Sequence, residues 1–289
     1  MDDALMQAGL AGTVTYETIH ASPFGTVRLD HVAIALPGRT AVTTGQLVLS
    51  GLQLRDGVLY GVHLEASDLS IPLLDLVRQG INVGSSSGLA TTLLGTGITV
   101  EQGQAAIDYR FDENDRELSF STTGRMAGIG GWSFGTRLVN VDPRWIEMVR
   151  PVTGLMMGQI SNGLAELAGS GSLPPPRLKQ LTWSLNDAPL WNRLQLVPGT
   201  PVPERQSSDP LPDEAQAARA FMAAGVPASK AREDAKTLAQ WERKGGTLSF
   251  ATDIEAPLPL INSGGLLGIE PAFPSAEAFV ARSHGNFSD

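Results

Sequence analysis

The residues from Gly12 to Ile71 constrain the fold more than any other part of the chain. They form four successive strand-like runs, separated by turns that contain Pro or Gly. Apolar and polar side chains alternate in most of them, whereas the third run is apolar on both parities around Leu47 to Leu49 and is expected to be central. The fourth run is the most regular, because every second residue in it is apolar. We therefore predict four antiparallel strands with a shared apolar face. The residues of the first and fourth runs that we place on this face are Val14, Tyr16, Val58, Tyr60, Val62 and Leu64.

The second run contains a break in its alternation. Val27 and Leu29 have one parity, whereas the apolar residues after His31 have the other. Two explanations are open: a β-bulge near Asp30 and His31, or a second half of the strand that is covered on both sides.

A helix is predicted to begin at Asp142, because Asp is a good N-cap and Pro143 suits the first helical position. It continues to residue 164 with one apolar stripe, and Pro151 should bend it. Such a helix usually covers a sheet. A contact with lipid is the alternative, since the stretch from Arg137 to Arg193 carries six basic residues against four acidic ones. The stripe residues that we consider for lipid contact are Trp145, Val149, Val152 and Met156.

The remaining patterns predict a mainly β protein of the α+β class: a long curved antiparallel sheet covered by a few amphipathic helices. The Gly/Ser/Pro-rich segment 169–176 is the best internal boundary. Residues 1–168 are then expected to form the sheet and its covering helix, and residues 177–273 to form returning strands with a two-helix insert. The tail 274–289 has little to bury and is expected to be mobile.

Composition excludes several classes of function. A net charge of −9 is wrong for a nucleic-acid binder, which needs clustered Lys and Arg. Cysteine is absent, so disulfides, thiolate catalysis and Cys-ligated metals are excluded. The sequence contains no apolar run long enough for a transmembrane helix, and its first residues lack the pattern of a signal peptide. We predict no cofactor.

Two motifs invite a chemical interpretation. Gly84 to Gly88 matches the Gly-x-Ser-x-Gly pattern of serine hydrolases, which would make Ser86 a nucleophile with His284 as its base. A flexible Ser/Gly loop explains the same residues. His31 and His63 could be neighbours across strands and bind a metal, but a solvated sheet face explains them as well. We predict neither an enzyme nor a metal site.

The opening of the sequence resembles the AsmA-like proteins of the Gram-negative envelope. The resemblance covers about the first sixty residues, in which a "v-x-y-x-x-I" strand, a short turn and a "v-x-L-x-x-V-x-I" strand follow one another. The segments 183–190 and 245–252 look like parts of a periplasmic family. The matching residues of the opening are Val14, Tyr16, Ile19, Ser22 to Gly25, Val27, Leu29, Val32 and Ile34.

The resemblance implies a periplasmic protein, held to the inner membrane by a segment that this sequence does not include. It implies a curved sheet that shelters lipid acyl chains or braces the envelope. The sequence departs from the family in lacking an N-terminal anchor helix and in being much shorter than the members that bridge the periplasm. We therefore expect a non-enzymatic role in lipid handling or envelope maintenance, with lipid, a membrane surface or another envelope protein as partner. The alternative is a structural or protein-interaction module whose core is filled.

Overall fold

The computed structural model of the protein describes residues 14–34, 42–55, 58–72, 100–128, 130–149, 176–186, 214–259, 261–262, 270–271 and 275–288. The segment Gly84 to Gly88 and residues 150–175 lie outside these ranges.

Twelve strands form one antiparallel sheet, and two further strands pair separately. The longest strands lie in the middle of the sheet, where they are stabilised by neighbours on both sides. In chain order the strands are β1 (Val14–Thr15), β2 (Thr18–Ala21), β3 (Val27–Ile34), β4 (Val42–Arg55), β5 (Val58–Pro72), β6 (Val100–Asp112), β7 (Glu117–Met126), β8 (Gly130–Val139), β9 (Arg177–Asn186), β10 (Thr247–Ala251), β11 (Leu258–Pro259), β12 (Ile261–Asn262), β13 (Glu270–Pro271) and β14 (Asn286–Ser288).

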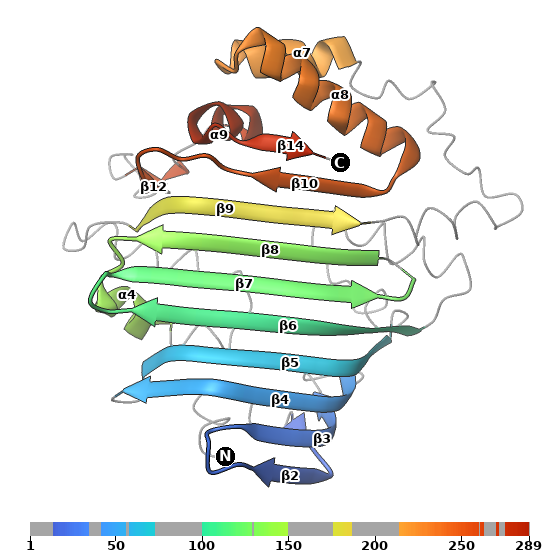
Figure 1. Cartoon of the computed structure of the whole chain (residues 1–289), viewed down its shortest axis with the longest axis vertical. Helices are drawn as coiled ribbons and strands as arrows, with labels where there is room; N and C mark the ends of the chain where they lie inside the picture. Colours follow the sequence, from blue (N-terminus) through green and yellow to red (C-terminus); the bar gives the residue numbers. More distant parts are fainter. Residues whose placement is uncertain are drawn as a thin grey trace, which may run out of the picture.

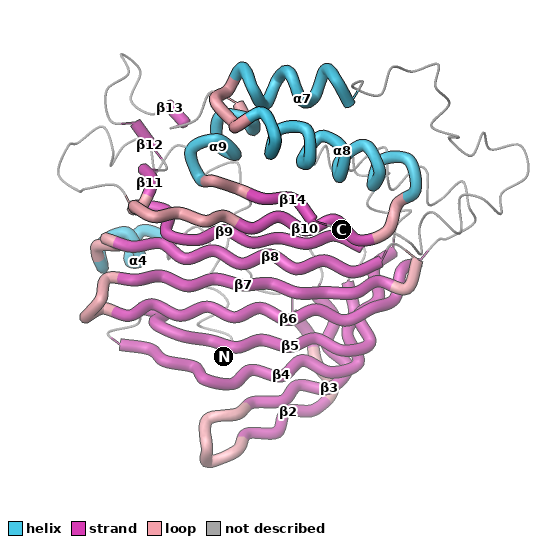
Figure 2. The backbone as a smooth tube through the Cα atoms, turned by 45° about the horizontal axis from the view of Figure 1, so that its top comes forward, coloured by secondary structure: helices cyan, strands magenta, loops and turns pink. Residues whose placement is uncertain are grey.

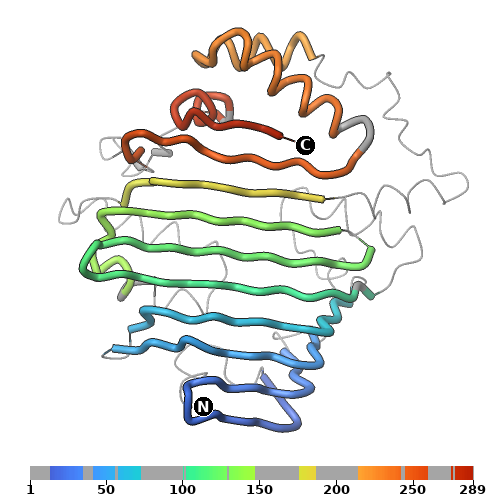
Figure 3. The backbone as a smooth tube through the Cα atoms, viewed as in Figure 1, coloured from blue at the N-terminus to red at the C-terminus, as the bar shows by residue number. Residues whose placement is uncertain are grey.

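Strands that follow one another along the chain lie side by side in the sheet. The order across it is β1-β3-β4-β5-β6-β7-β8-β9-β10-β14, with β2 beside β3 and β11 beside β9. The colours of Figure 3 therefore run from blue at one edge of the sheet to red at the other. The prediction of a mainly β fold of the α+β class, with a long antiparallel sheet, is confirmed.

The described helices lie at two places on the sheet. The short helix α4 (Pro143–Val149) follows β8 and lies near the turn between β6 and β7, whereas the other three gather beside β10 and β14 (Figure 1). Those three are α7 (Glu214–Ala223), α8 (Ala228–Lys244) and α9 (Ala276–Ser283).

The predicted first strand is interrupted. Tyr16 and Glu17 separate β1 from β2, although both strands pair with β3 in the same register. The interruption lies next to His31, which takes a left-handed conformation with φ = 51°. The break in alternation at Asp30 and His31 therefore coincides with a left-handed backbone conformation at His31.

The same irregularity crosses three strands and forms a crease in the sheet. His31 of β3 is followed across the ladder by Gly45 of β4 and then by Asp68 of β5, which also has a positive φ of 53°. The register between β3 and β4 is the same on both sides of the crease. In both strands, the side chains change faces at the same pair of residues, His31 and Gly45. At the crease, the register shifts between β5 and β6, from Ala66 to Leu69. Beyond the crease, the ends of these strands turn away from the plane of the sheet (Figure 2).

Small and polar side chains make the crease possible. A Cβ atom on Gly45 would lie 2.9 Å from the Cβ and Oδ2 atoms of Asp68, so this position has no room for a side chain. Thr44 is buried, and its hydroxyl donates to the carbonyl oxygens of Gln46 and Ser67, at 2.8 and 2.5 Å. These bonds satisfy backbone acceptors where the strands bend.

The segment 169–176 does not interrupt the sheet. Strands β8 and β9, which lie on either side of it in sequence, pair from Gly131 and Asn186 to Val139 and Arg177. The residues before and after the predicted boundary thus share one sheet.

The expectation of a mobile tail at 274–289 is wrong for residues 275–288. Ser275 caps α9 by accepting a hydrogen bond from the N–H of Ala278, and β14 pairs with β10. Val280 is buried with Phe250, so the tail does have apolar surface to bury. Its partner surface comes from distant residues, which the local sequence does not reveal.

Candidate functional site

One row of paired residues crosses nine strands on a single face of the sheet. Directly paired residues point to the same side of a sheet, so the register alone defines this row. All of its side chains are apolar except one threonine. From β3 to β14 the row is Val27, Leu49, Leu64, Ile107, Thr122, Phe134, Trp183, Phe250 and Phe287. We call this side the apolar face.

A buried cluster fills the end of the apolar face near α4. Trp145 and Ile146 of the helix are 3% and 6% exposed, and they pack with Val58, Tyr60 and Phe111. The sequence places Val58 and Tyr60 on the predicted apolar face, and Trp145 on a helix stripe considered for lipid contact. The structure places all three in a filled core.

The position of α4 is set by its N-cap. Asp142 accepts a hydrogen bond from the backbone N–H of Arg144 at 3.0 Å and two more from the Arg144 guanidinium at 2.9 and 3.0 Å. The Arg144 side chain is the main reason why the pKa of Asp142 falls to about 2. The predicted start of this helix is confirmed.

A second cluster fills the region of the apolar face beneath α7, α8 and α9. Phe250 lies at its centre, with its ring centroid 4.9 Å from that of Phe287 and 6.1 Å from that of Trp183. Phe221 of α7 and Val280 of α9 cover these rings and are almost fully buried. This part of the sheet is therefore an ordinary packed core.

Between the two clusters the apolar face is only partly covered. Ile107, in the middle of the row, is 36% exposed although it belongs to a central strand. Its apolar neighbours on the same face are half-buried. We define the central strip as Leu47, Leu49, Val62, Leu64, Ile107, Phe120 and Phe134.

Tyr109 marks the boundary between the central strip and the α4 cluster. Burial raises the pKa of its phenol to about 12, with a smaller contribution from Tyr60. Because the neutral phenol is favoured in the folded state, this part of the face provides an apolar environment rather than a site for charge.

The predicted lipid-contacting residues thus separate into groups. Val62 and Leu64 lie in the central strip, whereas Val14 and Tyr16 lie at the β1 edge, where Tyr16 is 37% exposed. Val149 is the last residue of α4. Val152 and Met156 lie outside the described residues.

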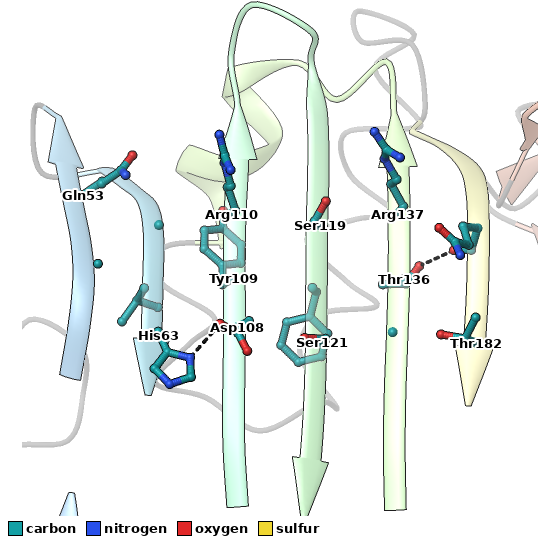
Figure 4. A pocket seen from close by; sticks show the side chains of 16 residues that line it. Gln53, His63, Asp108, Tyr109, Arg110, Ser119, Ser121, Thr136, Arg137 and Thr182 are labelled. Atoms are coloured by element: carbon teal, nitrogen blue, oxygen red, sulfur yellow. Dashed lines mark hydrogen bonds and ion pairs between the residues drawn. The ribbon is translucent and has the colours of Figure 1, made fainter. Parts of the chain in front are cut away.

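The opposite side of the sheet, which we call the polar face, carries a shallow groove of about 440 Å³. Figure 4 shows it extending across β4 to β9, with its polar side chains rising from successive strands. His63 and Asp108 pair at one side, with 2.7 Å between Nδ1 and Oδ1. The sequence does not reveal this groove, because its residues come from six strands whose pairing cannot be read from the pattern of residues. The polar residues among those that line it are Gln53, His63, Asp108, Tyr109, Arg110, Ser119, Ser121, Thr136, Arg137, Gln180 and Thr182.

The two histidines considered as possible metal ligands pair with different carboxylates. His31 pairs with Glu17 at 2.8 Å, and His63 pairs with Asp108. Within the described ranges, no group of three His, Asp or Glu residues could hold a metal ion. Ser86 lies outside those ranges, and His284 forms the left-handed C-cap of α9.

Among the helices that the structure describes, none has the length and apolar character needed to cross a membrane. No family model matches the sequence, and a search of curated proteins gave no match.

Proposed function

We propose that this protein binds the acyl chains of lipids on the central strip of its apolar face. In this proposal it is a non-enzymatic envelope protein that handles lipid or maintains the envelope, resides in the periplasm and is anchored to the inner membrane. The location rests on the resemblance of the first sixty residues to AsmA-like proteins.

The partly covered centre of the apolar row carries the proposal. Burial of a Leu, Ile or Phe side chain contributes roughly 1.5–3 kcal/mol, so a central strand normally covers such residues completely. Here both ends of the face are filled by the protein's own helices, while Ile107 between them stays 36% exposed. The half-buried apolar side chains around Ile107 extend this partly exposed surface, and apolar patches on a protein surface favour an interaction site.

A structural or protein-interaction module is the second candidate. The packing of Trp145 against Val58 and Tyr60 favours it, because this end of the face holds a filled core. In that case the central strip would contact protein rather than lipid.

Native mass spectrometry of the protein purified from cells tests the proposal. We expect bound species with the masses of membrane lipids. Two adjacent threonines give a matched pair of variants, since Thr122 lies in the apolar row and Thr123 lies on the polar face. Thr122→Glu places a carboxylate among apolar chains and should reduce the bound fraction about tenfold or more, because a buried unpaired charge is costly.

Thr123→Glu should leave the bound fraction unchanged. Circular dichroism of both variants checks that the sheet is intact. A wild-type spectrum that contains only the mass of the free chain would reject lipid binding and favour the interaction module.

A further inference from the structure

The groove on the polar face contains a cation without a partner in the described part of the chain. Arg110 makes no ion pair or side-chain hydrogen bond with any residue that the structure describes, and it is exposed. An arginine that serves only the fold of an acidic protein would usually pair with one of its many carboxylates. Arg110 therefore calls for a different explanation.

The nearest carboxylates on the same strand are engaged elsewhere. Asp108, two residues before Arg110, pairs with His63. Asp112, two residues after it, accepts hydrogen bonds from the backbone N–H groups of Asn114 and Asp115, at 3.0 and 3.3 Å. Both flanking carboxylates therefore already have partners, and the hollow that Arg110 shares with Asp112, Asp115 and Glu117 also contains Ser119 and Arg137.

A second arginine lies on the other side of a serine in the same row. Arg110 pairs with Ser119 across β6 and β7, and Ser119 pairs with Arg137 across β7 and β8. The two arginines are thus two strand spacings apart, roughly 10 Å at the backbone. Figure 4 shows both guanidinium groups pointing toward the same end of the strands, with Ser119 between them. Glu117 pairs with Arg137 and also with Lys179, so its charge is shared between two cations.

The groove beside this row offers neutral hydrogen-bonding groups. The hydroxyls of Ser121 and Thr182 and the amides of Gln53 and Gln180 line it. A Cβ atom on Gly61, which pairs with Arg110, would be in ordinary van der Waals contact with Gly51 and Gln53, the nearest atom being 3.4 Å away.

We propose that this groove binds a phosphate monoester of a small polyhydroxylated molecule. Arg110 and Arg137 hold the phosphate over Ser119, and the hydroxyl and amide groups bind the rest of the ligand. A phosphate suits this arrangement better than a carboxylate, because its three terminal oxygens can accept hydrogen bonds from two guanidinium groups on opposite sides. The site lies on the face opposite the central strip, so it does not depend on the proposed binding of acyl chains.

Isothermal titration calorimetry of the full chain tests the proposal with glycerol 3-phosphate, glycerate and glycerol as probes. We expect glycerol 3-phosphate to bind with a Kd in the range of roughly 0.01–1 mM. Glycerate should bind at least about tenfold more weakly, and glycerol should not bind. Vesicles that contain phosphatidylglycerol, compared with vesicles of phosphatidylcholine alone, show whether a lipid headgroup or a free ester is preferred.

Two arginine variants distinguish ligand binding in the groove from a general effect of the protein's charge on affinity. Arg110→Gln should weaken the binding of glycerol 3-phosphate, or of the phosphatidylglycerol vesicles, about tenfold or more, because charge-assisted hydrogen bonds are lost. Arg125→Gln is the matched control. It removes the same charge from the polar face of β7, six residues or roughly 20 Å from Ser119. This control should change the Kd by less than about twofold.

Three results would overturn the proposal. The first is the absence of binding to any phosphate-bearing probe at ~10 mM ligand. The second is equal affinity for glycerate, and the third is equal weakening by both arginine variants. Thermal unfolding of each variant shows whether the fold is retained. If Arg110→Gln unfolds, Gly61→Leu fills the groove instead and should abolish binding.

Discussion

Asp234 shows how one buried charge organises the end of the sheet. It is 1% exposed, and its carboxylate lies 2.9 Å from Nζ of Lys230, one turn earlier on α8. It also accepts a hydrogen bond from the backbone N–H of Phe287 at 3.3 Å, while Lys230 donates to Asn286. The pair therefore fixes β14, the last strand, against the helix.

We expect Asp234→Ala to lower the free energy of unfolding by about 3 kcal/mol, because it leaves the Lys230 ammonium and a backbone N–H without their partner. Urea unfolding measures the change. Glu233→Ala, at the exposed neighbouring position, is the control and should shift the free energy by less than about 0.5 kcal/mol. Equal effects of the two substitutions would show that the buried pair does not hold β14.

The ionised carboxylate of Asp30 stabilises the hairpin formed by β2 and β3 at the edge of the sheet. Its carboxylate accepts hydrogen bonds from the Arg28 guanidinium, at 2.9 and 3.2 Å, and from the hydroxyl of Thr18 on β2 at 2.9 Å. The Arg28 bond, followed by the Thr18 bond, lowers the pKa of Asp30 to about 2. A carboxyl with a depressed pKa stabilises the fold above its unfolded pKa, near 4, and loses this effect as the pH falls through its folded value.

We therefore expect the hairpin of β2 and β3 to loosen between about pH 4 and pH 2. Hydrogen exchange of the amides of Thr18 to Ala21 measures this as a loss of protection. In Asp30→Asn the protection should be lower at pH 6, and the difference from wild type should shrink at pH 2. A difference that persists unchanged at pH 2 would contradict the assignment.

At the scale of the elements, the crease across β3, β4 and β5 is the main departure from a regular sheet. It depends on small and polar residues at one row rather than on the strand propensities around it. Thr44 supplies a buried hydroxyl to two carbonyl oxygens, whereas its neighbour Thr43 is exposed.

Thr44→Val tests the contribution of that hydroxyl with almost no change of shape. We expect a loss of about 1–3 kcal/mol in the free energy of unfolding, because the carbonyl oxygens of Gln46 and Ser67 lose the one hydroxyl hydrogen that they share. Thr43→Val should be neutral or slightly stabilising, since valine suits an exposed strand position. The measurement is the midpoint of urea unfolding, and equal midpoints for the two variants would refute the role of Thr44.

The sequence predicts where the helices and strands lie better than it predicts which of them pair or pack together. The regular alternation from Val58 to Leu64 predicted β5, and the parity break indicated either a local change near His31 or a strand covered on both sides. The continuation of that break through Gly45 and Asp68 could not be predicted, because it depends on which residues pair. The groove beside Arg110 was missed for the same reason. The tail was mispredicted because the aromatic surface that it covers comes from strands far away in the sequence.

At the scale of the whole molecule, the two faces of one sheet carry different chemistry. The apolar face is filled at both ends by the protein's own helices, and the central strip remains between them. The polar face carries the groove with Arg110 and Arg137. Because alternate residues of each strand lie on opposite faces, substitutions at two adjacent positions test the two faces separately.

Photocrosslinking in cells tests lipid binding on the central strip most directly. A benzophenone amino acid replaces either Phe134, which lies in the strip, or Ser133, its neighbour on the polar face. With radiolabelled phospholipid, we predict strong lipid labelling from position 134 and little from position 133. Equal labelling at both positions, or labelling of protein partners alone at position 134, would contradict the proposal that the strip holds acyl chains.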